Sequence, residues 1–134
     1  QLQQSDDEQL AAIAAKALKE TTYHLRWSSE WVIRLGDGTD ESHKRMLHAI
    51  DELWRYTGEL FEAADYETAM GIDLTSIKQS WTEKVTAVFD EAKLPVPENV
   101  FMQSGGKKGV HTEQLGYILT ELQYLQRTYP GAKW

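Results

Sequence analysis

The chain has 134 residues, of which 41% are hydrophobic and 26% charged, with a net charge of −7 and a pI near 5.0. This length and composition predict one globular domain, or part of one. The acidic charge argues against a general nucleic-acid binder, and the absence of cysteine excludes disulfides, thiolate nucleophiles and Cys-rich zinc sites. No apolar run approaches the roughly 20 residues of a membrane span and no signal-peptide pattern opens the chain, so we expect a cytoplasmic protein.

The first predicted element is one long helix. Gln1–Gln4 is expected to be the frayed end of a preceding helix, because the chain opens without Met. Residues 5–35 contain neither Pro nor Gly, which allows a single helix of about 45 Å at 1.5 Å per residue. Asp6 and Asp7 suit the positive end of its dipole. Gly36 is expected to end the helix in the left-handed C′ position.

Helical spacing places one apolar stripe along this helix, interrupted by two polar residues. Glu20 and His24 are four residues apart, so they lie side by side on that stripe. A polar group that is buried costs free energy unless it finds a partner. We therefore expect Glu20 and His24 to form a polar pair within a core. The stripe consists of Ile13, Ala17, Glu20, His24, Trp27, Trp31 and Leu35.

Three further helices follow. Thr39 or Asp40 is expected to cap a helix over 41–63, and a loose acidic connection over 64–73 leads to a helix over 74–93. Pro95 and Pro97 then start an extended segment that ends in a glycine-rich loop, 103–109. The last helix starts near 111–113 and stops at Pro130. Apolar residues at three-and-four spacing define the inward sides: Met46, Ile50, Leu53, Trp54, Thr57, Leu60 and Phe61 in the second helix, Ile77, Trp81, Val85, Val88 and Phe89 in the third, and Leu115, Ile118, Leu119, Leu122 and Leu125 in the last.

These elements predict an all-α protein without strands or internal repeats. Several segments, in the same order along the chain, resemble the phenylacetic acid catabolic protein family, and in particular its structural, non-catalytic members. The segments are AIAAKALKE (12–20), YHLRWS (23–28), RLGDGT (34–39), LWRYTGELF (53–61), GGKKGVHTEQLG (105–116) and LQYLQR (122–127).

The resemblance implies a ferritin-like helical bundle about twice as long as this chain. Residues 1–134 would then be a single all-α domain, or the C-terminal half of a larger one: the last bundle helix plus the helices appended after it. It also implies a structural subunit of a phenylacetyl-CoA monooxygenase complex, which braces a catalytic di-iron subunit. The expected partners are that subunit, a second copy of the chain and an N-terminal half; nucleic acid and membrane are not expected. No cofactor is expected in this chain, since the di-iron centre would belong to the partner.

Ferritin-like di-iron sites use inward carboxylates and a Glu-x-x-His step on each of two helices. Here Tyr23 stands three residues after Glu20, and His24 comes one place late. No Glu-x-x-His occurs anywhere in the chain. We therefore interpret Glu20, Tyr23 and His24 as a degenerate metal-site position and predict no metal and no catalytic residue. Two alternatives stay open: a catalytic di-iron subunit with its remaining ligands on an N-terminal half, and a stand-alone helical interaction module.

Two other groups of residues have both a functional and a structural interpretation. Lys107 and Lys108 lie among glycines, so they could contact the phosphates of coenzyme A or an acidic partner, or simply belong to a solvated connecting loop. Trp27, Trp31 and Trp54 are candidates for an interface, because large aromatic side chains are enriched at interface cores. Thr112 and Glu113 are expected to start the last helix as a cap, which removes the need to invoke acid–base chemistry by His111.

Overall fold

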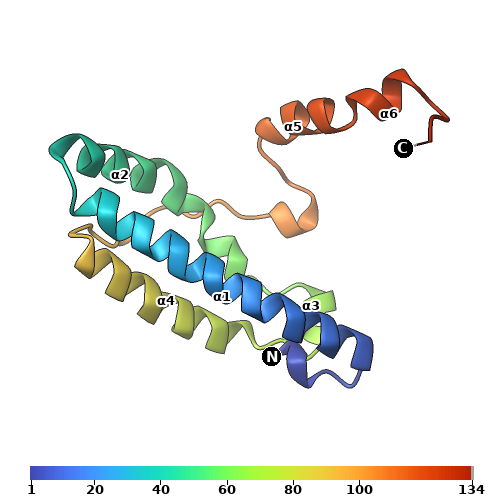
Figure 1. The fold of residues 1–134 in the computed structure, drawn as a ribbon, viewed down its shortest axis with the longest axis horizontal. Coiled ribbons are helices and arrows are strands. Elements are labelled where there is room, and N and C mark those ends of the chain that lie inside the picture. The colour runs from blue at the N-terminus through green and yellow to red at the C-terminus, as the bar shows by residue number, and fades with distance from the viewer. Residues whose placement is uncertain (134) are drawn as a thin grey trace. The chain divides into compact units, whose positions relative to one another are not determined.

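The computed structural model describes residues 1–133, which divide into two compact units, Gln1–Gln103 and the segment that begins at Ser104. The first unit contains η1 (Leu2–Gln4), α1 (Glu8–Gly36), α2 (Asp40–Leu53), η2 (Trp54–Tyr56), η3 (Gly58–Phe61), α3 (Asp65–Ala69) and α4 (Leu74–Glu91), where η marks a 3-10 helix. The second contains η4 (Gly106–Lys108), α5 (Gln114–Leu122) and α6 (Tyr124–Thr128). All elements of the described residues are helical, so the predicted all-α class is confirmed (Figure 1).

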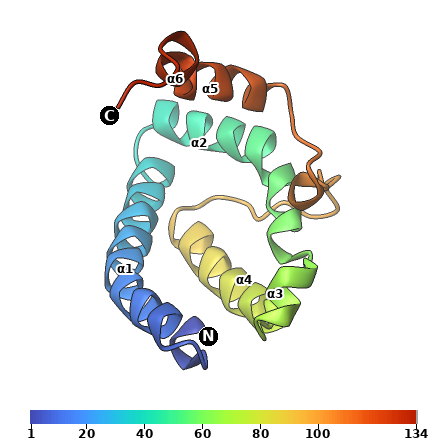
Figure 2. The same ribbon diagram turned by 90° about the vertical axis from the view of Figure 1, so that its right-hand side faces the viewer.

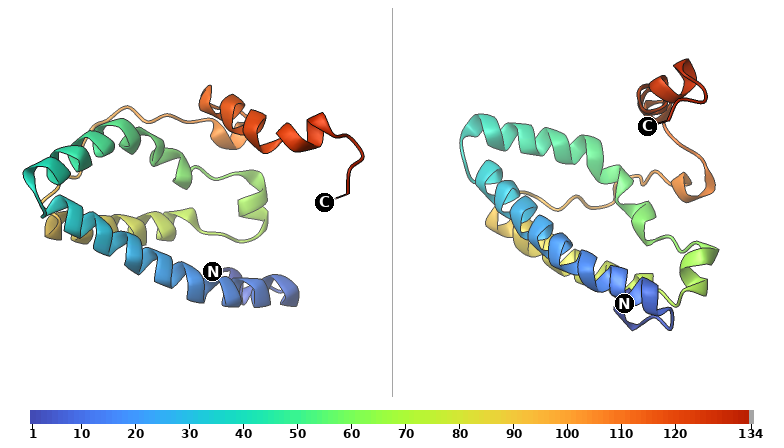
Figure 3. Two further views of the ribbon diagram at one scale, coloured as in Figure 1. Left: turned by 45° about the horizontal axis from the view of Figure 1, so that its top comes forward. Right: turned by 45° about the vertical axis from the view of Figure 1, so that its right-hand side comes forward.

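In the first unit, α1 and α4 lie side by side and run parallel (Figures 1 and 3). At one end, the Gln1 side chain donates to the Asp73 carbonyl oxygen at 3.0 Å and accepts from the Asp73 amide at 2.8 Å. At the other end, Gly36 packs against Ala92. Helix α2 leaves α1 through a short turn and diverges from it (Figure 2). The long helix is thus held at both of its ends.

The most buried residues lie at this second end, where α1 and α4 both finish. Val88, Ala92 and Leu94 are the buried hydrophobic residues, and Gly36 is buried beside them. An aromatic cluster extends the packing along α4. Ring centroids are 5.7 Å apart for Trp54 and Trp81, 5.8 Å for Trp54 and Phe89, and 5.2 Å for Phe61 and Trp81.

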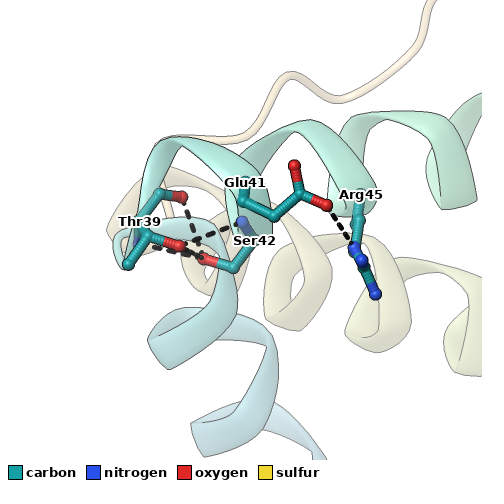
Figure 4. A network of polar contacts seen from close by, with 4 residues as sticks. All are labelled: Thr39, Glu41, Ser42 and Arg45. Carbon is teal, nitrogen blue, oxygen red and sulfur yellow. Dashed lines mark hydrogen bonds and ion pairs between the residues drawn. The ribbon is translucent and has the colours of Figure 1, made fainter.

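Two helix starts use the capping chemistry that their sequences indicate. Asp7 precedes α1 and accepts from the amides of Gln9 and Leu10 at 2.9 and 3.0 Å. Thr39 precedes α2 and accepts from the Ser42 amide at 3.2 Å, while the Ser42 hydroxyl accepts from the Thr39 amide at 3.0 Å (Figure 4). This reciprocal arrangement is a capping box, so Thr39 rather than Asp40 caps the helix.

Gly36 does not have the predicted left-handed C′ conformation. It is the last residue of α1, and it is not among the glycines with positive φ. A Cβ at this position would lie 2.5 Å from the Ala92 carbonyl oxygen and 2.8 Å from the Ala92 Cβ. The glycine is needed because α4 approaches the backbone closely, which is a tertiary effect that the local sequence does not reveal.

The predicted helix over 41–63 ends earlier than expected. Helix α2 stops at Leu53, and two 3-10 turns carry the chain on to Phe61. The Thr57 hydroxyl donates to the Trp54 carbonyl oxygen at 2.9 Å, which gives the backbone an alternative to the helical bond. A Cβ on Gly58 would lie 2.9 Å from Cγ of Met102, so the returning chain packs closely on this bend.

Other boundaries differ by small amounts. The connection expected over 64–73 contains α3, and the last helix is interrupted at Gln123 into α5 and α6. Residues 94–103 form no helix, but they are not extended throughout, because Asn99 lies at a bend with a φ of 54°. The Gln103 amide donates to the Arg55 carbonyl oxygen at 2.8 Å. Thr112 does not cap the last helix through its side chain: the N-cap is Glu113, without a side-chain hydrogen bond.

Candidate functional site

The predicted stripe of the long helix forms an uncovered surface of the first unit. We call the seven residues Ile13, Ala17, Glu20, His24, Trp27, Trp31 and Leu35 the outer face of α1, because all are exposed. Ile13 is 57% exposed, Trp27 55% and Trp31 44%. The side of α1 that packs within the unit is a different one, made of the half-buried or buried residues Leu10, Ala11, Ala14, Ser29, Val32, Ile33 and Gly36.

Helix α1 therefore has two apolar sides, of which the unit covers only one. The covered side is rich in small residues, which let a neighbouring helix approach closely. The outer face carries the larger side chains. A helix that is apolar on both sides is typical of one buried between several elements. The sequence pattern identified the face with the larger side chains, and the packing inside the unit uses the face with the smaller ones.

Two tryptophans on the outer face pack against each other. The rings of Trp27 and Trp31 meet edge to face, with centroids 6.3 Å apart, and the Arg34 guanidinium carbon lies 5.7 Å from the Trp31 ring centroid. One helical turn separates the two tryptophans, so α1 itself fixes their spacing. They form a preassembled aromatic patch. Trp54, the third predicted interface residue, is half-buried in the aromatic cluster with Trp81 and Phe89 and does not join this patch.

Glu20 and His24, the predicted polar pair, lie near each other on α1, but residues 1–133 do not bury them. Nε2 of His24 lies 3.8 Å from Oε1 of Glu20, and the two side chains are 64% and 75% exposed. This separation is longer than a hydrogen bond. Tyr23 lies beside the pair, with its ring centroid 6.2 Å from that of His24. The pair is therefore an exposed contact along one helix. Only residues outside the first unit could bury Glu20 and His24.

The surroundings of this pair provide no cluster of metal ligands. Among residues 1–133 there is no group of three or more His, Asp or Glu side chains that could hold a metal ion. Glu20 and His24 offer two donors, whereas a carboxylate-bridged di-iron site takes several inward carboxylates and two histidines. Within the described residues, the donor set therefore does not fit a di-iron centre.

The basic loop lies in the second unit, where η4 carries Lys107 and Lys108 between two left-handed glycines. Gly105 has φ 102° and Gly109 has φ 84°. The amides of Lys108 and Val110 both donate to the Gly105 carbonyl oxygen at 2.9 Å, and the Gly109 amide donates to Gly106 at 3.1 Å. Because these amides are engaged within the loop, they do not form a phosphate cradle.

Sequence reasoning missed two features of the first unit. Helical spacing places His43 on or near a polar side, which predicts a solvated residue, yet it is half-buried, and its Nδ1 lies 2.7 Å from the Gly36 carbonyl oxygen. This contact satisfies a carbonyl at the C-terminal end of α1. The second feature is an open apolar cleft between α1 and α4, lined by Ala14, Leu18, Thr21, Ile72 and Ile77 among others, and by Ala17 at the edge of the outer face. Neither feature has a local sequence signal, because both depend on elements distant in the chain.

Comparison with known proteins agrees with the resemblance seen in the sequence. The phenylacetic acid catabolic protein family matches residues 1–134. The chain belongs to this family. It is also similar to one of the subunits of the 1,2-phenylacetyl-CoA epoxidase of Escherichia coli strain K12, with 49% identity over 138 residues. That alignment covers 99% of this chain and 56% of the relative, so the chain spans little more than half of that protein's length.

Within the described part of this family member, no helix is both long and apolar enough to cross a bilayer. The outer face of α1 carries Glu20 and His24 among its apolar side chains.

Proposed function

We propose that the chain is part of a non-catalytic structural subunit of a multicomponent phenylacetyl-CoA epoxidase, which braces the di-iron catalytic subunit. Its 49% identity to a subunit of the Escherichia coli epoxidase is the observation that carries this proposal. The described residues contain two neighbouring potential ligands on α1 and no larger metal-binding group, so a di-iron site would need ligands from outside them. The di-iron centre and the oxygen chemistry are assigned to the partner.

The outer face of α1 supports a role in assembly. Exposed apolar surface that is contiguous over several helical turns is unusual on an isolated soluble protein and marks a surface that other polypeptide covers. We assign this cover to bundle helices from the remaining part of the subunit, to a second copy of the chain, or to both. The Trp27 and Trp31 patch would lie at the centre of such a contact, where rigid aromatic side chains contribute most.

Covering this face would also change the environment of Glu20 and His24. The pair is open to water in the first unit, but it lies on the same face as the two tryptophans. Once covered, each polar group would need the other as a partner. The pair would then act as a core contact at a degenerate metal-site position, as the sequence predicts.

Co-purification tests the proposal. The complete subunit that contains this chain, expressed with the catalytic subunit of the same epoxidase, is expected to elute with it as one complex. Iron analysis of the separated subunits is expected to find the metal with the catalytic subunit. Stoichiometric iron retained by the subunit of this chain after dialysis, and lost in Glu20→Ala, would support the catalytic alternative instead. Elution of the two subunits apart at all salt concentrations would favour a stand-alone interaction module.

Variants of the aromatic patch separate an assembly role from folding. Trp27→Ala combined with Trp31→Ala removes the exposed patch, and Lys19→Ala, an exposed residue beside the outer face on the same helix, is the control. The double variant is expected to weaken association at least tenfold, because aromatic residues at the centre of a contact contribute about 2 kcal/mol or more each. An association constant equal to that of Lys19→Ala would show that the patch does not take part in assembly.

For the basic loop, we propose a contact through the side chains of Lys107 and Lys108, made either with the phosphates of coenzyme A or with an acidic partner surface. The amides of Lys108, Gly109 and Val110 are engaged within the loop, so we place the contact on the lysine side chains. Replacing both lysines with Ala is expected to weaken the contact and to flatten its salt dependence. Titration with free coenzyme A and with the catalytic subunit distinguishes the two ligands. Unchanged affinity for both, at low and at high salt, would leave these lysines as solvated loop residues.

A further inference from the structure

We draw no further inference here: the strongest candidate, the exposed apolar face of α5 and α6 in residues 104–133, carries nothing because nothing in the structure shows what covers it.

Discussion

Gly36 lies where the C-terminal ends of α1 and α4 meet, and the space around it leaves no room for a side chain. Its neighbours are the Ala92 carbonyl oxygen, the Ala92 Cβ and a methyl carbon of Leu94. Its own carbonyl oxygen accepts from His43, and the following residue, Asp37, pairs with Lys93. Three helices are therefore joined around a single glycine. The same corner holds the buried residues of the first unit.

We expect Gly36→Ala to destabilise the chain. The new methyl group would have to push α1 and α4 apart, and overpacking of this kind costs about 1–3 kcal/mol. Gly116→Ala is the matched control, because nothing lies within 4 Å of a Cβ there and alanine is the better helix former. Denaturant unfolding followed by circular dichroism measures both. Equal stability of Gly36→Ala and the parent would contradict the close approach seen at this corner.

Asp73 caps α4 and is expected to make stability depend on pH. Hydrogen bonds from the backbone amides of Ser76 and Thr75 hold the pKa of its carboxyl group below the usual value of 3.8. Because the folded-state pKa is lowered, the charged carboxylate adds stability above the unfolded-state pKa. This contribution is lost as the pH falls through the folded-state pKa.

A carbon-detected NMR titration of Asp73 checks the first part of this prediction, and urea unfolding at a series of acidic pH values checks the second. Asp73→Asn keeps an acceptor for the helix amides but has no charge to titrate. It should therefore lose the share of the pH dependence that Asp73 contributes. A pKa of the Asp73 carboxyl group at or above its usual value would show that its hydrogen bonds to the helix amides do not persist in solution.

At the scale of the elements, helix α2 shows how local sequence sets a boundary at one end and tertiary packing sets it at the other. Its start follows from Thr39 and Ser42, which satisfy each other's backbone amides (Figure 4). Its end at Leu53 is accompanied by one local contact, from the Thr57 hydroxyl to the Trp54 carbonyl oxygen, but tertiary packing accounts for the bend. The chain bends there so that Trp54 and Phe61 reach Trp81 on α4. Apolar spacing alone predicted that the helix would continue. The pattern does not show which side chains have to contact another helix, and so it does not show where the chain must bend.

The cap of α2 gives a prediction with an internal control. Thr39→Ala removes the acceptor for the Ser42 amide and is expected to cost about 0.5–2 kcal/mol of unfolding free energy. Glu41→Ala removes the ion pair in which Nε of Arg45 lies 2.7 Å from Oε1 of Glu41 (Figure 4). Both of these side chains are well exposed, so the second change is expected to cost only a few tenths of a kcal/mol.

Thermal or chemical unfolding of the two variants under identical buffer conditions makes the comparison. The Glu41→Ala effect should also shrink further when salt is added, since exposed ion pairs are screened. If Glu41→Ala lost more unfolding free energy than Thr39→Ala, the ion pair would stabilise the start of α2 more than the hydrogen bond from the Ser42 amide to Thr39 does.

At the scale of the whole molecule, the described chain leaves much of its apolar surface open. Val88, Ala92 and Leu94 are its only buried hydrophobic residues among residues 1–133, whereas many large apolar side chains are exposed. The outer face of α1 and the face of α5 and α6 are both examples. A chain of 134 residues is long enough to bury a substantial core. The open faces therefore fit a polypeptide that completes its packing with another.

We expect the isolated 134-residue chain not to behave as a closed monomer. It should bind a hydrophobic dye, and it should associate in sedimentation as its concentration rises, because uncovered apolar faces reduce their contact with water by meeting. Addition of the partner polypeptide should lower dye binding. A cooperative monomer that binds no dye at any concentration would contradict the prediction.

The sequence by itself determined the helical class, the long first helix with its acidic start, a cap at Thr39 or Asp40 and the end of a helix before Pro95, because each rests on local periodicity or backbone chemistry. It also located Glu20 and His24 side by side on one helical face. Only the tertiary structure decided which side of α1 packs inside the chain, why Gly36 has no side chain, and that His43 satisfies the end of α1. Those outcomes depend on which elements contact one another in the folded chain. An amphipathic pattern indicates that a helical face is buried, but it does not indicate which element buries it.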